Sequence, residues 1–332
     1  MTNARSRWLR ITTSLAFVAL LVPFAMHVDW RAAAAAARGA DPRLLVLAFA
    51  CNQLSLMLKG ARWWVFLRPL GVRSPSLVLR ATYAGASLNN LVVAQGGEAA
   101  RVLLVSRASR VPATAVAGAL ALERVLDGVS YLTLLTGAAF AFDLPQSLAR
   151  WRIPAAIALA GSAVVLFALG TRPQSGVEQH SPSTTVRGRV HATLRRFAKS
   201  VSQTATAARL TAAMFLSLAA WALQVATYHA VALAAHLPIS LAGSVAAMLA
   251  IGISFLIRAT PGNVGIFQVI YAVTVASFGI DRPAAVAAAL LIQAVQIVPT
   301  VVLGTLAAHG LIGAPARELD GQAGAITPIP IE

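Results

Sequence analysis

Two short stretches decide the fold of this chain, Gln95-Gly96-Gly97 and Pro261-Gly262-Asn263-Val264-Gly265. Each lies in the middle of a longer apolar stretch, the first in residues 81–106 and the second in residues 240–279. Because proline ends an incoming helix and glycine permits positive φ, a helix that reaches either stretch is expected to stop and restart there. The sequence therefore predicts two broken helices in apolar surroundings.

The composition of the whole chain indicates that these surroundings are a lipid bilayer. Of the 332 residues, 58% are hydrophobic and only 11% are charged. A soluble domain usually has about a quarter of its residues charged, so there are too few charges here to cover a water-facing surface. We therefore expect a polytopic membrane protein.

Apolar segments of spanning length surround the two breaks. They cover residues 11–27, 44–66, 112–142, 153–170, 210–235 and 284–309. Arg5, Arg7 and Arg10 precede the first segment, which therefore also has the form of a signal sequence. Because similarly apolar segments follow along the chain, we expect it to remain uncleaved as the first span. The predicted fold is all-α, with about six full spans and two broken, re-entrant helix pairs.

Basic residues around the breaks predict the orientation. They precede and follow the first break closely, at Lys59, Arg62, Arg68, Arg73, Arg80, Arg101, Arg107 and Arg110. Since basic residues accumulate in cytoplasmic loops, both ends of this pair are expected inside. The second break is flanked by sparsely charged segments, 236–238 and 279–283, which resemble outer turns. The first pair should then enter from inside and the second from outside, with both chain termini cytoplasmic.

One integral membrane domain is expected over residues 1–312, followed by a disordered tail over 313–332. It divides into a first half at about 44–142 and a second half at about 210–309. The basic linker between them, residues 171–208, is either a loop that sets the topology or a segment that binds anionic lipid.

An internal repeat connects the two halves. Residues 115–125 match residues 285–295 at an offset of 170, and the same offset places Glu98 on Gln268. Because the two broken pairs are predicted to enter from opposite sides, the repeat would be inverted, as in many transporters.

Three acidic residues fall in segments predicted to lie in or near the bilayer: Glu98, Glu123 and Asp127. An unpaired carboxylate costs at least a few kcal/mol there, so each should be paired or protonated inside the protein. Arg101 follows Glu98 by one helical turn, and Arg124 lies beside Glu123. These residues either form structural ion pairs or handle a substrate or a proton, and the two roles are compatible.

The start of the helix after the first break is a candidate anion site. Glu98 should stand in its first turn, where the helix dipole favours an anion, and the same place suits a lipid phosphate held by Arg101 and Arg258. Asn89 and Asn90, ahead of the break, either satisfy unpaired backbone carbonyls or bind a headgroup.

Other function classes lack a signature. The membrane segments contain no HExxH, GxSxG or P-loop motif, so an enzyme and a bound cofactor are not expected. Cys51 is the only cysteine, and the six histidines are scattered. The net charge of +16 is concentrated between apolar segments, which favours anionic lipid over nucleic acid as partner.

The motifs around both breaks resemble the flippase-like membrane domain of bacterial lysylphosphatidylglycerol synthases and its stand-alone relatives. They are Asn89-Asn90, Gly97-Glu98-Ala99-Ala100-Arg101, Glu123-Arg124-Val125-Leu126-Asp127 and Pro261-Gly262-Asn263-Val264-Gly265, and the resemblance covers residues 10 to 310. The chain departs from the family pattern in lacking a proline before Gly97-Glu98, in having Asn263 in place of a glycine and in having Gln268 in place of an acid. The last departure puts a proton-carrying role of that position in doubt.

The resemblance implies movement of a charged or glycosylated lipid between the leaflets of a bacterial inner membrane. The soluble aminoacyl-transferring domain of the synthases is absent, so this chain is not expected to make lysyl-lipid.

The leading hypothesis is a non-enzymatic flippase for an anionic or headgroup-modified phospholipid, a glycolipid or a polyprenyl-phosphate-linked sugar. The alternatives are an accessory subunit that presents a lipid-linked substrate to a membrane glycosyltransferase, and a membrane-embedded lipid-modifying enzyme. The candidate site residues are Asn89, Asn90, Gly96, Gly97, Glu98, Arg101, Glu123, Arg124 and Asp127 in the first half, and Arg258, Pro261, Gly262, Gly265 and Gln268 in the second.

Overall fold

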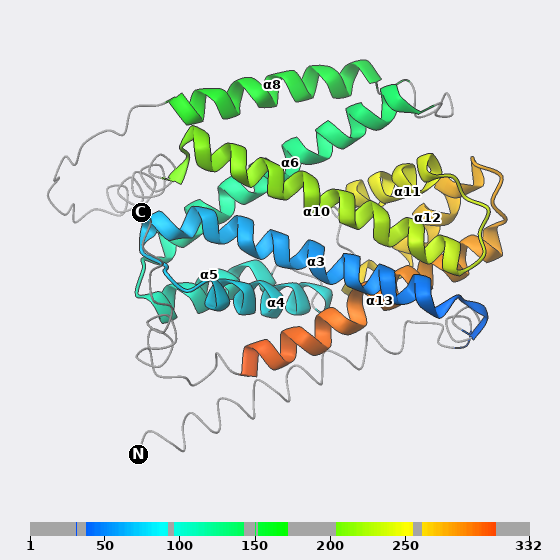
Figure 1. Ribbon diagram of the computed structural model, residues 1–332, viewed down its shortest axis with the longest axis horizontal. Helices are drawn as coiled ribbons and strands as arrows, with labels where there is room; N and C mark the ends of the chain where they lie inside the picture. The colour runs from blue at the N-terminus through cyan, green and yellow to red at the C-terminus, as the bar shows by residue number, and fades with distance from the viewer. Residues whose placement is uncertain are drawn as a thin grey trace, which may run out of the picture.

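The computed structural model describes residues 31, 38–91, 96–142, 150, 152–171, 204–254 and 261–309. Within these ranges the chain forms nine α-helices and two short 310-helices, and no strand (Figure 1). The five long helices are α3 (Pro42–Leu67), α6 (Ala113–Ala141), α8 (Arg152–Thr171), α10 (Ala207–Ala234) and α13 (Arg282–His309). The short ones are α4 (Pro75–Leu91), α5 (Gly96–Ser109), α11 (Leu241–Ser254), α12 (Ile266–Ala276), η1 (Arg68–Leu70) and η2 (Pro261–Asn263). The predicted all-α fold is confirmed.

The five long helices coincide with five of the six predicted spans. Three of them, α3, α10 and α13, are long and apolar enough to cross a membrane. Helix α6 is 29 residues long but carries three charged residues in its first half. Large apolar side chains such as Phe215 and Ile157 remain 73% and 68% exposed, which suits a surface that faces lipid. The predicted first span, 11–27, lies outside the described residues.

Helices α3 and α10 form the antiparallel pair at the centre of the molecule, side by side along their length (Figure 1). The Asp41 N–H, just before α3, donates to the carbonyl of Ala234 at the end of α10 at 3.0 Å. Further along, Ser55 Oγ donates to the carbonyl of Ala220 at 2.8 Å. Hydroxyl-to-backbone bonds of this kind hold helices together where the hydrophobic effect between them is weak.

Each apolar stretch that contains a predicted break is divided into two short helices. Helices α4 and α5 pack against each other on either side of the first break, and α11 and α12 do so on either side of the second, with η2 between them. The four helices contain 17, 14, 14 and 11 residues. Each is shorter than the about 20 residues that a full crossing needs. In both halves the order is therefore two short helices followed by a long one.

Two hydrophobic cores hold these elements. One is centred on Trp63, Phe66 and Leu126, where α3, α4, α5, α6 and the start of α10 meet. The other is centred on Phe267 and Tyr271, where the end of α10, α11, α12 and the start of α13 meet.

Two basic residues that were predicted to be loop charges do not lie in a loop. Lys59 and Arg62 were expected to flank the first break from a loop, but both lie within α3. Arg62 is 1% exposed. These two cations therefore bear on the interior of the protein and not on which side of the membrane a loop lies. The predicted tail, Arg258 and most of the predicted linker lie outside the described residues.

Candidate functional site

A cluster of buried ion pairs joins helices α3, α5 and α6. Arg101 on α5 binds Glu123 on α6, with its two terminal nitrogens 3.3 and 2.9 Å from the two carboxylate oxygens. Arg62 on α3 binds the same carboxylate at 3.1 Å and Asp127 at 2.6 Å. Glu123 and Arg101 are only 2% and 5% exposed. One carboxylate thus connects two arginines from two other helices, in an environment where ion pairs are only weakly screened.

The cluster continues toward a more open edge. Arg124 lies 2.7 Å from Glu98 and 3.4 Å from Asp127, and its side chain is 46% exposed. Exposed pairs of this kind contribute little to stability compared with the buried ones. The inner part of the cluster therefore fastens three helices, while the outer part is free to rearrange at small cost.

The charges of this cluster balance. Three arginines, Arg62, Arg101 and Arg124, meet three carboxylates, Glu98, Glu123 and Asp127. The guanidinium group of Arg101 also stacks on the ring of Trp63, 4.2 Å from its centroid. Arg62 was not among the predicted site residues. The available signal was its position inside the predicted span 44–66, where a charged residue needs a partner.

The start of α5 is fixed by two close contacts with α4. The Gly97 N–H donates to Asn89 Oδ1 at 2.9 Å, so Asn89 satisfies a backbone group at the break. This agrees with one of the two predicted roles, although the group is an N–H and not a carbonyl. A Cβ on Gly97 would lie 2.0 Å from the carbonyl oxygen of Gly85, so only glycine permits the two helices to approach this closely.

The second break is built from left-handed turns and amide hydrogen bonds. Gly262, Asn263 and Gly265 have φ values of 59°, 58° and 88°. Asparagine is among the few residues that tolerate this conformation, which explains how Asn263 replaces the glycine of the family pattern. Gln268 accepts from the Gly265 N–H at 2.6 Å and donates to Gln293, and Gln293 donates to the carbonyl of Gly262 at 2.9 Å.

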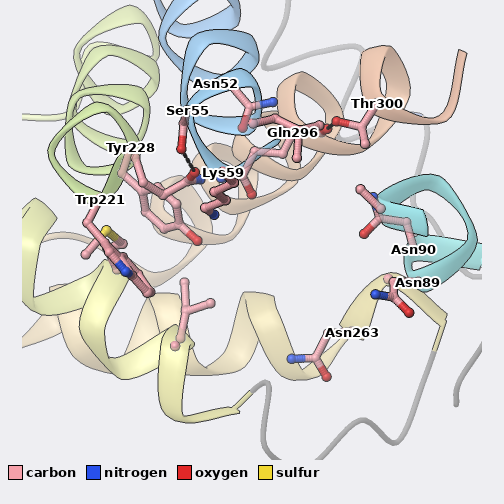
Figure 2. Close-up of a pocket in the computed structure, with 17 residues that line it drawn as sticks. Asn52, Ser55, Lys59, Asn89, Asn90, Trp221, Tyr228, Asn263, Gln296 and Thr300 are labelled. Atoms are coloured by element: carbon pink, nitrogen blue, oxygen red, sulfur yellow. Dashed lines mark hydrogen bonds between the residues drawn. The ribbon is translucent and has the colours of Figure 1, made fainter. Parts of the chain in front are cut away.

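A polar cavity of about 290 Å³ lies between the two halves, with walls from α3, α4, α10, α11, α13 and η2. Figure 2 shows the labelled side chains that line it, which come from α3, α4, α10, α13 and η2. Its lining is Asn52, Ser55, Leu56, Lys59, Ala86, Asn89, Asn90, Trp221, Gln224, Tyr228, Met248, Ile251, Gly252, Gly262, Asn263, Gln296 and Thr300. Six of these side chains are amides, which both donate and accept hydrogen bonds.

Among the described residues that line the cavity, Lys59 is the only charged one, and it was not among the predicted site residues. It lies three residues before Arg62 on α3, near the centre of the view in Figure 2. Its ammonium group lies 5.6 Å from the centroid of the Trp221 ring. A lysine three residues from a buried arginine, inside a predicted span, is the signal that would have found it.

The structure brings the predicted site residues together in two groups. Glu98, Arg101, Glu123, Arg124 and Asp127 form the ion cluster together with Arg62. Asn89, Asn90 and Gly262 line the cavity, and the η2 turn that begins at Pro261 lies against α4. Gly96 and Gly97 open α5, whereas Gly265 and Gln268 open α12 beyond the η2 turn. Arg258 lies outside the described residues, so its predicted role stays a prediction.

The described residues also bear on the other classes of site. Among them, no group of three or more histidine, cysteine, aspartate or glutamate side chains could hold a metal ion. Glu98, Glu123 and Asp127 do gather, but each is engaged by an arginine.

Comparison with known proteins gives one finding on identity. The model of the family described as the lysylphosphatidylglycerol synthase TM region matches residues 8–304, nearly the whole chain. No curated protein matches. The chain therefore belongs to this family, as its motifs indicated, and it is a multi-pass membrane protein of that family.

Proposed function

We propose that this member of the lysylphosphatidylglycerol synthase TM region family moves a lipid between the leaflets of a bacterial inner membrane by passing the headgroup through its polar cavity. The observation that carries this proposal is the cavity itself. A space lined by six amides, a hydroxyl-bearing serine and threonine and one lysine is costly inside an apolar protein unless it serves a polar ligand. Its volume of about 290 Å³ lies near the lower end of the range for small-molecule sites and suits one headgroup.

The two broken helix pairs supply a route by which the cavity can open to either side. Helix α4 of the first pair, and α11 and the η2 turn of the second, contribute to the cavity wall. If the two halves form an inverted repeat, the pairs enter the membrane from opposite sides, and rocking one half against the other exposes the same cavity alternately. The common order of short, short and long helices in the two halves supports this arrangement.

The buried ion cluster has a supporting role in this proposal. Its charges are already paired, so its inner part fastens α5 and α6 to α3 beside the cavity. The lipid cargo then binds in the adjacent cavity, and the energy comes from the lipid gradient or an ion gradient. We propose no covalent chemistry, since the described residues that line the cavity include no carboxylate, histidine or cysteine that would act on a headgroup.

The second candidate function is an accessory subunit that binds the headgroup of a lipid-linked substrate and presents it to a separate membrane glycosyltransferase. The cavity would serve both functions equally. The difference is whether the lipid completes the crossing in this chain alone.

The experiment is a lipid-movement assay in liposomes that contain only this protein. Headgroup-labelled phosphatidylglycerol, a glycolipid and a polyprenyl phosphate would each be tested, with protein-free liposomes as reference. We expect at least one of them to cross faster with the protein than without it. If none crosses, the flippase proposal fails, and binding of the same lipids without movement would support the accessory subunit.

A further inference from the structure

The charges around the cavity indicate which cationic side chain is available to bind a ligand. The three arginines and three carboxylates of the neighbouring cluster compensate one another. Lys59 adds a fourth cation. Within the described part of the chain, no carboxylate lies within 4 Å of its ammonium group. Asp127 attracts Lys59 from farther away, but its two oxygens are bonded to Arg62 and Arg124.

An unpaired ammonium group in a membrane protein interior is costly, and such groups mark substrate pathways. The ring of Trp221 offers partial compensation, but a cation–π contact at 5.6 Å is weaker than an ion pair. Counted over the described residues, the cavity therefore lacks one negative charge. A ligand that brings one negative charge to Lys59 restores the balance.

The uncharged walls specify the remainder of the ligand. Asn52 on α3 and Asn90 on α4 line the cavity, and neither side chain makes a hydrogen bond within the described residues. Amide groups pair well with hydroxyl groups, which also donate and accept. The two free amides thus favour a headgroup with hydroxyls next to its phosphate.

The same walls disfavour a positively charged headgroup. None of the lining residues that the structure describes is an aspartate or glutamate, so an ammonium group on the ligand would meet no counter-charge among them. The aromatic face of Trp221, which could attract a cation, already has Lys59 over it. A diphosphate is disfavoured for the opposite reason, because one lysine leaves its second negative charge uncompensated.

We infer that Lys59 binds the phosphate of a lipid whose headgroup carries a single phosphodiester charge and neutral hydroxyl groups, and that aminoacylated, choline-bearing and diphosphate-linked lipids are poor ligands. The inference rests on the proposed function for the lipid nature of the ligand. It goes beyond that function in naming the binding residue and the charge class of the headgroup.

The test is isothermal titration of the full-length chain in detergent micelles with short-chain lipids. Dihexanoyl phosphatidylglycerol has one charge and two headgroup hydroxyls, and dihexanoyl phosphatidylcholine adds an ammonium group. Farnesyl diphosphate adds negative charge, and inorganic phosphate has no lipid. We expect phosphatidylglycerol to bind at least about tenfold more tightly than the other three, as the loss of a charge-assisted hydrogen bond would produce.

Two variants of Lys59 and one control isolate its charge. Lys59→Met should weaken binding of phosphatidylglycerol by about tenfold or more, whereas Lys59→Arg should retain affinity within about threefold. The matched control is Arg68→Met, because Arg68 is an exposed cation on η1, next to the same helix, and stands over Trp64 away from the cavity. It should bind like the wild type.

A second variant keeps the test decisive if Lys59→Met fails to fold. Asn90→Leu should remove the preference for phosphatidylglycerol over dihexanoyl phosphatidylmethanol, which has the same charge without hydroxyls. Equal binding of phosphatidylcholine, or full affinity in folded Lys59→Met, would overturn the inference, and equally tight binding of inorganic phosphate would overturn its lipid part. Lys59-dependent binding without movement in liposomes would contradict the flippase proposal alone.

Discussion

In each half of the molecule, side chains at corresponding positions connect a short helix after the break to the long helix that follows. The contacts are ion pairs in the first half and uncharged hydrogen bonds in the second. The offset of 170 places Glu98 on Gln268 and Glu123 on Gln293. In the first half these positions carry ion pairs with Arg124 and Arg101. In the second half the same two positions bond directly to each other, glutamine to glutamine.

This difference shows that a polar contact between the short helix and the long helix does not require charged side chains. Tyr271 stands where Arg101 stands in the first half, and it packs in a hydrophobic core. Buried ion pairs are often no more stabilising than uncharged replacements, yet removing one partner is severe. The charges of the first half therefore make that half sensitive to single substitutions, and they lie beside the one cavity lysine that the cluster does not neutralise.

The largest effect should come from Glu123→Gln. This change leaves Arg62 and Arg101 without the carboxylate that they share, so the free energy of unfolding should fall by about 3–5 kcal/mol. Denaturant unfolding in detergent micelles would measure it. The matched variant is Gln293→Met at the corresponding position of the second half, which removes only uncharged hydrogen bonds and should cost less. Equal losses in the two variants would contradict the contrast between the halves.

A smaller loss is expected from Gly97→Ala, which tests the backbone contact at the first break. The added Cβ would lie 2.0 Å from the Gly85 carbonyl oxygen, so α4 and α5 must separate. We expect the thermal midpoint to fall by the equivalent of about 1–3 kcal/mol. Gly96→Ala is the control, because its Cβ meets nothing closer than Leu88 Cδ2 at 4.0 Å. The contact argument is wrong if both alanines behave alike.

Gln268→Glu restores the acid that the family pattern has at this position. A carboxylate still accepts from the Gly265 N–H, but it no longer donates to Gln293 and places a charge among amides. We expect a destabilisation of about 1–2 kcal/mol, measured by thermal unfolding at neutral pH. A neutral or stabilising result would show that the second half accepts charge as readily as the first.

The smallest effect on stability should come from Glu98→Gln. Its partner Arg124 is 46% exposed, so loss of the pair should cost no more than about 1 kcal/mol. The same unfolding measurement as for Glu123→Gln gives a direct ranking of the two acids. A loss as large as that of Glu123→Gln would mean that the inner and outer parts of the cluster contribute equally to stability.

The sequence predicts the broken helices and the acids well because both depend on local signals. Glycine and proline within apolar stretches stop helices wherever they occur, and a carboxylate in a span requires a partner. It predicts the cavity poorly, because Lys59, Asn90 and Thr300 come from three helices whose contacts no local pattern specifies.

Arg62 and Lys59 show where a rule about loops does not apply. Basic residues near the end of an apolar segment usually lie in a loop, and the positive-inside rule concerns residues in loops. Here α3 continues to Leu67, and α6 places Glu123 and Asp127 opposite Arg62. Since both acids need partners inside the protein, a cation within another predicted span, such as Arg62, is the sequence signal for this pairing.

The most direct test of the account is movement of headgroup-labelled phosphatidylglycerol in liposomes that contain Lys59→Met or wild-type protein at equal amounts. The account predicts that Lys59→Met loses about tenfold or more of the rate while its thermal midpoint stays close to that of the wild type, because Lys59 holds cargo and not the fold. Movement at the wild-type rate by folded Lys59→Met protein would contradict the account.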